Sequence, residues 1–197
     1  MYYDGIIPNI ELIKQYYPDY WVYIYVGNEY LKERIEPLYN MSNIKVIHTG
    51  VSGAENMMYR FFAIDDADVE VMHVRDLDSR IHVRDRWCID KFMTSNHNAY
   101  TIRDNNQHGT DMMGGLWGCK RTNIHIKQIF DSSKIQLYKQ KMVMGYDQDF
   151  LRNYIYPKLK SSFIDFGLFN YRNSQYFMIP KDLAPHLYCG AVSNLIE

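Results

Sequence analysis

The sequence has almost no net charge. Its 22 basic and 23 acidic residues leave a formal charge of -1 over 197 residues. Such a chain presents no strongly basic face, so nucleic-acid binding is not indicated. An anionic ligand would have to be held by local arginines or by a metal ion.

Cysteine is scarce as well. Cys88, Cys119 and Cys189 are odd in number, widely spaced and free of any Cys-x-x-Cys pair. This spacing predicts neither a disulfide framework nor a zinc site. It favours a reducing, cytoplasmic setting.

Long apolar runs are also missing. No stretch approaches the roughly 18 to 20 apolar residues that cross a membrane, and the N-terminus lacks the charged-then-apolar order of a signal peptide. The sequence shows no repeat and no linker rich in Pro, Gly or Ser, and its 47% hydrophobic content is enough for one sizeable core. We therefore expect no membrane segment and a single domain over residues 1–197.

Aromatic residues are abundant, with 18 Tyr, 9 Phe and 3 Trp. Their rings either fill the core or line a binding site for sugars, whose C–H faces pack against aromatic faces.

Short apolar runs alternate with helical patterns along the chain. Strands are expected at 21–26, 43–48, 69–74 and 99–103, and the part from about Ser161 onward is typical of loops and short strands. This alternation predicts an α/β fold with a mainly parallel central sheet flanked by helices.

Helices are expected in three places. Ile6 to Tyr17 shows helical spacing, Asn56 is placed to cap a helix through Phe62, and another helix begins near Asp147 with Pro157 as its stop. Because the chain opens on a helical pattern, either the usual first strand lies outside this sequence or the sheet is ordered differently.

Asp76 and Asp78 carry the clearest chemical signal. They directly follow the expected strand 69–74, and ligands of open α/β sheets bind beyond the carboxyl ends of strands. Two carboxylates there can hold Mg²⁺ or Mn²⁺ together with diphosphate oxygens. The flanking Arg75 and Arg80 either contact phosphates or balance the carboxylates.

Position separates this Asp-x-Asp from two others. The pair at Asp66 precedes the strand, and the pair at Asp147 opens a helix. One alternative is a phosphatase of the haloacid-dehalogenase type, with Asp76 as nucleophile and Asp78 as general acid. That pattern has Thr or Val where this chain has Arg80.

Five blocks in order resemble the GT-A type of glycosyltransferase domain, particularly those encoded by large DNA viruses of algae. The blocks are 57–62, 75–80, 103–108, 114–118 and 145–151.

The resemblance implies a Rossmann-like GT-A domain, with a nucleotide-sugar half at about 1–120 and an acceptor half at about 121–197. It implies transfer of a hexose or deoxyhexose from a nucleoside diphosphate, preferably UDP, to a hydroxyl of a glycan or other acceptor, with Mn²⁺ or Mg²⁺. For a viral protein the location would be the host cytoplasm. Acceptor choice would then depend on a partner or on a larger polypeptide.

For the metal, the resemblance implies Asp76 and Asp78 as ligands that also hold the donor diphosphate. His186 matches the place of a third protein ligand, although its surroundings depart from the family pattern, and a surface histidine is the alternative.

For the donor, the resemblance implies Arg60 and Arg75 at basic positions and Gly114 and Gly115 beside the sugar. Alternatively, Arg60 pairs with Asp65 or Asp66, and the two glycines only form a bulge or a turn.

For the reaction, the resemblance places Asp147, Gln148 and Asp149 beside the anomeric carbon. A carboxylate there acts as a base or stabilises an oxocarbenium-like charge. Alternatively, these acidic residues only complement the dipole of the helix that they begin. His108 is a candidate for contact with the acceptor.

The chief departure is the missing opening strand, which in the family helps to hold the base. No residue is therefore assigned to the base, and a non-catalytic module that binds a nucleotide sugar or glycan stays a second alternative.

Overall fold

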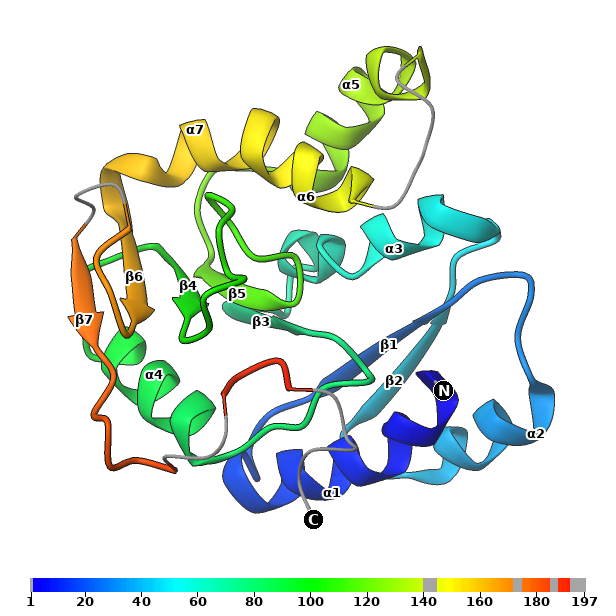
Figure 1. The fold of residues 1–197 in the computed structure, drawn as a ribbon. Coiled ribbons are helices and arrows are strands. Elements are labelled where there is room, and N and C mark those ends of the chain that lie inside the picture. The colour runs from blue at the N-terminus through cyan, green and yellow to red at the C-terminus, as the bar shows by residue number, and fades with distance from the viewer. Residues whose placement is uncertain (1, 140–144, 172–174, 185–187, 192–197) are drawn as a thin grey trace.

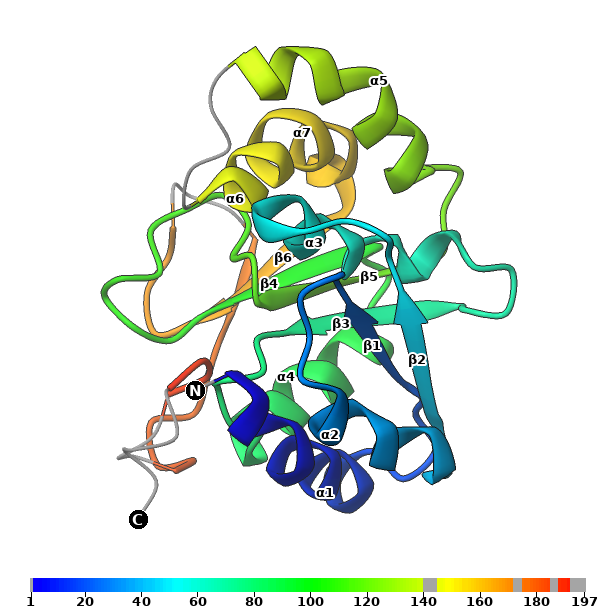
Figure 2. The ribbon, with the colours of Figure 1, turned by 90° about the vertical axis from the view of Figure 1, so that its right-hand side faces the viewer.

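The computed structural model describes residues 2–139, 145–171, 175–184 and 188–191. Two views show three layers, with α3, α5, α6 and α7 on one side of the strands and α1, α2 and α4 on the other (Figures 1 and 2). The α-helices are α1 (Ile6–Tyr16), α2 (Lys32–Ile35), α3 (Asn56–Tyr59), α4 (Val83–Met93), α5 (Ile126–Lys139), α6 (Tyr146–Phe150) and α7 (Tyr156–Leu159). The strands are β1 (Val22–Val26), β2 (Ile44–His48), β3 (Val71–Arg75), β4 (Ala99–Arg103), β5 (Leu116–Lys120), β6 (Phe163–Gly167) and β7 (Tyr176–Met178).

Five strands form the main sheet, in the order β3-β5-β4-β6-β7. β5 is antiparallel to both of its neighbours, whereas β4, β6 and β7 pair in parallel, so β5 alone runs against the other four. The expected α/β fold with a mainly parallel sheet between helices is confirmed. All five residues of β4 are buried, as expected for a strand covered on both faces.

β1 and β2 form a separate parallel pair. Among the described residues no strand precedes α1, so the first strand of the fold is β1, which follows the opening helix. β1 corresponds to the strand expected at 21–26, and the chain opens on the expected helix. The four strands expected from the sequence are present, with bounds that differ by at most two residues.

The core divides into three clusters according to which helices cover the strands. Met72 and Val74 of β3 face the cluster under α5 and α6, together with the fully buried Trp117 and Phe61. Val71, which precedes Met72, packs on the opposite side with the cluster under α4. This alternation follows from the two-residue period of a strand. The third cluster joins β1 and β2 to α1 and α2.

Two helix expectations need correction. α3 is a single turn that starts at Asn56, whose side chain accepts a hydrogen bond from Thr49 Oγ1 at 2.7 Å instead of capping the helix. Pro157 does not stop its helix, which continues to Leu159. A π-helical turn ends at Ile155, so Pro157 falls in the first turn of α7, where a missing N–H does no harm.

None of the described helices is both long enough and apolar enough to cross a membrane.

Candidate active site

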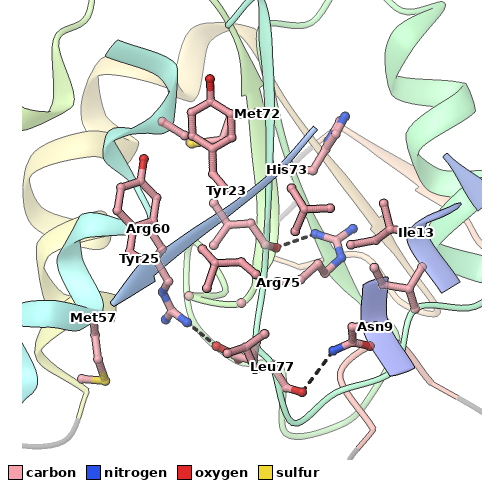
Figure 3. A pocket seen from close by; sticks show the side chains of 18 of the residues that line it. Asn9, Ile13, Tyr23, Tyr25, Met57, Arg60, Met72, His73, Arg75 and Leu77 are labelled. Carbon is pink, nitrogen blue, oxygen red and sulfur yellow. Dashed lines mark hydrogen bonds and ion pairs between the residues drawn. The ribbon is translucent and has the colours of Figure 1, made fainter. Parts of the chain in front are cut away.

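A cavity of about 1620 Å³ lies between β1 and β3, which belong to different sheets. Every residue of both strands lines it, and the side chains converge on its wall as Figure 3 shows. Its volume exceeds the roughly 300 to 1,000 Å³ of a typical small-molecule pocket. The sequence candidates Arg60, Arg75, Asp76, Asp78 and His108 also line it. So do Gly114, Gly115, Asp147 and Gln148.

Asp76 is the first residue after β3, and Asp78 lies in the turn that follows. The turn is fixed by backbone contacts, since Ser79 donates to the Asp76 carbonyl and the Asn9 amide donates to the Leu77 carbonyl at 3.0 Å. Asn9 comes from α1 and reaches the loop from the side opposite Arg60 (Figure 3). The predicted place of Asp76 at the carboxyl end of a strand is confirmed.

Arg60 connects two of the carboxylates. Its Nη1 contacts Asp76 Oδ1, and its Nη2 lies 2.5 Å from Asp147 Oδ2. The alternative partners are engaged elsewhere, because Asp65 accepts from the backbone at the start of α5 and Asp66 pairs with Lys45. One guanidinium thus holds the turn after β3 against the start of α6.

Other side chains pack so closely against Gly114 and Gly115 that little space is left for a Cβ at either position. A Cβ on Gly115 would lie 2.0 Å from Asp76 Oδ2, and one on Gly114 would lie 3.0 Å from Asp147 Oδ2 and 3.2 Å from Arg60 Nη2. Neither glycine has a positive φ, so the constraint comes from space and not from backbone conformation. Both glycines lie in a turn before β5, in which the Leu116 N–H donates to the Met113 carbonyl at 3.1 Å. The alternative of a turn is therefore confirmed, and what approaches the two glycines closely is the side chains of Asp76 and Asp147.

Asp147, Gln148 and Asp149 divide between two environments. Asp147 is 6% exposed and faces the cavity, and Gln148 lines it and accepts a hydrogen bond from Thr110 Oγ1 at 3.0 Å. The Asp149 side chain is half exposed, pairs with Arg152 at 2.9 Å and does not line the cavity. Of the three, only the first two are brought to the cavity wall.

Arg75 points into the protein from the end of β3. Its Nε lies 2.6 Å from the buried Asp85 of α4, and its Nη1 donates to the Val74 carbonyl at 2.6 Å. Its charge is therefore used to fasten β3 to α4, although part of the side chain lines the cavity. Arg80 lies further along the turn, where its backbone N–H donates to the Ala191 carbonyl.

His108 is buried beside the cavity, with its Nδ1 3.7 Å from Asp104 Oδ1. Burial and, next, the nearby Arg103 guanidinium lower the pKa of His108 to about 4. The ring is therefore neutral at pH 7 and can accept or donate one hydrogen bond. His186, the third ligand predicted for the metal, lies outside the described residues.

The aromatic residues lie both in the core and along the cavity. Trp117 and Phe92 are fully buried in the core, whereas Trp21, Tyr23 and Tyr25 line the cavity.

Two carboxylates at the cavity mouth fit a hard divalent cation. Mg²⁺ in particular is usually bound by one or two carboxylates, with phosphates and water filling its other positions. Asp76 and Asp78 supply that number and both line the cavity. A different group, His82, Asp85 and Cys189, gathers three ligand atoms within 4.8 Å behind the cavity wall.

The sequence did not single out two residues that hold this site in place. Asn9 and Thr110 hold the Asp76 turn and Gln148 in place. Asn9 could have been noticed because it is a polar residue between Ile6 and Ile10 on the apolar face of α1. No comparable signal marks Thr110.

No protein-family model matches the chain, and no curated protein matches it. Among solved structures, the chain is similar to a glycosyltransferase involved in the glycosylation of the major capsid of PBCV-1. The identity is 13%, the TM-score is 0.48, and the match covers 75% of this chain and 82% of that one. A likeness of this size decides neither the fold family nor the activity, which have to be inferred from the residues themselves.

Gly115→Ala should displace the Asp76 carboxylate, because the new methyl group would overlap Asp76 Oδ2 and Cγ. The side chain can rotate away, so the fold should survive while any ligand affinity that depends on Asp76 falls. Calorimetric titration with nucleotide and Mn²⁺ measures the effect. Gly109→Ala is the matched control, since its Cβ would meet nothing within 4 Å. Equal affinities in the two variants would contradict the assigned geometry.

Acidification should destabilise the protein through His108. The unfolded side chain has a pKa of about 6.5, so between that pH and about 4 the unfolded chain binds a proton that the folded chain does not. Stability present at pH 7 is lost as the pH falls, by up to about 2 kcal/mol at pH 5 from this residue. Urea unfolding of His108→Gln at pH 7 and pH 5 should show a smaller loss than the parent protein. The exposed His125→Gln should not reduce it, and an unchanged loss in His108→Gln would refute the assignment.

Proposed function

We propose that this chain is a glycosyltransferase that moves a sugar from a nucleoside diphosphate, preferably UDP, to a hydroxyl of a glycan or other acceptor. The observation that carries the proposal is the Arg60 bridge between Asp76 and Asp147 at a large cavity, backed by Gly114 and Gly115. It brings together carboxylates for a metal and diphosphate, two glycines that let these carboxylates pack closely, and a buried carboxylate for the reaction.

The donor diphosphate is proposed to bind at the turn after β3. Asp76 and Asp78 would hold Mn²⁺ or Mg²⁺, which when bound neutralises charge on the leaving diphosphate. Asn9 keeps this turn in position through the Leu77 carbonyl. Arg75 supports it from behind through Asp85 and is assigned no phosphate contact, since its guanidinium is engaged inside the protein.

The sugar is proposed to lie beside Gly114 and Gly115, next to the Asp76 and Asp147 carboxylates that pack against these two glycines. This places the anomeric carbon between Asp76, on the diphosphate side, and Asp147.

The reaction joins the acceptor oxygen to the anomeric carbon and breaks that carbon's bond to the diphosphate oxygen, which leaves with the electron pair. In an inverting course Asp147 takes the proton of the acceptor hydroxyl, and in a retaining course its charge stabilises the oxocarbenium-like transition state. Gln148, held by Thr110, offers its amide N–H groups to the acceptor. The donor half, about 1–120, and the acceptor half, about 121–197, meet at this point.

Asp76→Asn and Asp78→Asn should each lower the rate of nucleoside diphosphate release from UDP-sugar by at least about 100-fold, because the cation that stabilises the leaving group loses a ligand. The assay uses a panel of glycan acceptors with Mn²⁺. Asp90→Asn is the control, since this aspartate is exposed and pairs with Arg86 on the far end of α4.

Three results would overturn the proposal. The first is full activity in both variants. The second is donor binding by the parent protein without turnover of any acceptor, which would indicate a binding module. The third is hydrolysis of an aryl phosphate in Mg²⁺, which would indicate the phosphatase chemistry.

A further inference from the structure

Three buried side chains meet where α4 begins. His82 precedes the helix, Asp85 lies in its first turn, and Cys189 comes from the turn at 188–191. One ligand atom from each lies within 4.8 Å of the other two. Their exposed fractions are 6%, 1% and 0%, so solvent does not satisfy them.

The polar atoms of this group lack partners. His82 Nε2 and Asp85 Oδ2 are buried and make no hydrogen bond to any described residue. A buried polar atom without a partner costs free energy, and a carboxylate oxygen costs more than a neutral group. These two atoms and the buried Cys189 thiol belong to the group whose ligand atoms lie within 4.8 Å of one another, so a cation bound there would give both atoms a partner.

The ligand types select the partner. A thiolate, an imidazole and a carboxylate together suit Zn²⁺, whereas Mg²⁺ and Mn²⁺ prefer oxygen ligands. In a tetrahedral zinc site the ligand atoms lie roughly 3.4 to 3.7 Å apart, as follows from bond lengths of about 2.0 to 2.3 Å. From the limit of 4.8 Å, the separations need to close by about 1.1 to 1.4 Å at most.

The surrounding charges are compatible with a cation. Asp85 Oδ1 is held by Arg75 Nε at 2.6 Å, which orients the carboxylate and leaves Oδ2 for the metal. Asp104 accepts from Arg84 and from the Cys189 backbone N–H at 2.8 Å, so the two arginines face two aspartates. Burial and, next, the Asp85 carboxylate raise the pKa of Cys189 and so keep its thiol protonated, and zinc binding would have to displace that proton.

Binding has one identifiable cost. His82 Nδ1 accepts from the Arg84 backbone N–H at 3.3 Å. With zinc on Nε2 the proton moves to Nδ1, and this long contact is lost. One weak helix cap is a small loss against three metal bonds.

We propose that His82, Asp85 and Cys189 form a structural zinc site that fastens the turn at 188–191 to the start of α4. The site is separate from the Asp76 and Asp78 turn. It supports that turn indirectly, because Asp85 holds Arg75 at the end of β3 and Gly190, next to Cys189, lines the cavity.

Cobalt titration of the full chain, stripped with a chelator and dialysed, tests the site. One equivalent of Co²⁺ should produce a thiolate-to-cobalt charge-transfer band in the near ultraviolet, and Zn²⁺ should abolish it. Cys189→Ser should lose the band. Cys119→Ser, which removes a buried thiol of β5, should keep it.

Absence of the band in the parent protein would overturn the proposal, and so would its persistence in Cys189→Ser. Because the parent protein itself gives the reading, a variant that fails to fold does not hide the answer. Asp76→Asn should keep the cobalt band while losing metal-dependent donor turnover, so the two proposals can fail independently.

Discussion

The ion pairs of Arg60 are the interaction on which the site depends. The guanidinium joins Asp76 to Asp147, which lie 16 and 87 residues away along the chain. The first belongs to the turn after β3 and the second to the start of α6, so one side chain sets the distance between the proposed donor and acceptor sides. Gly114 and Gly115 make this possible, because any side chain there would enter the space of the two carboxylates.

A second line of charges supports this arrangement from inside. Arg75 leaves the end of β3 and meets Asp85 at the start of α4, and Asp85 in turn adjoins Cys189. Charges this deeply buried are stable only when they are paired, so removing one partner is costly. Charged side chains therefore hold the Asp76 turn from two sides: Arg60 on the cavity side, and the ion pair of Arg75 with Asp85 on the side of α4.

Much of the fold follows from local patterns in the sequence. The runs of β1 to β4 and the position of Asp76 at a strand end could be predicted because both depend on neighbouring residues. The antiparallel direction of β5 could not, because it is decided by which strand β5 pairs with. The helix end predicted at Pro157 was wrong for a related reason. Only the π-helical turn before Pro157 places it in the first turn of a helix.

The site was partly predictable for the same reason. A resemblance in five blocks named Arg60 and Gly115, but it did not reveal that the first binds Asp76 and Asp147 or that the second faces Asp76. Asp149 shares a short motif with Asp147, yet successive helix residues point in different directions, which sends it to Arg152. The position of Cys189 in the sequence does not match any spacing typical of metal ligands, because the side chains beside it in space come from the start of α4.

The central claim is that the Asp76 turn binds a nucleoside diphosphate together with a divalent cation. Calorimetric titration of the unaltered chain with UDP-glucose, GDP-sugar and dTDP-sugar, in Mn²⁺ and then in chelator, tests it most directly. We predict saturable binding of one nucleotide series, with UDP preferred, in Mn²⁺ alone. Binding that is equally strong in chelator, or no binding of any series, would contradict it.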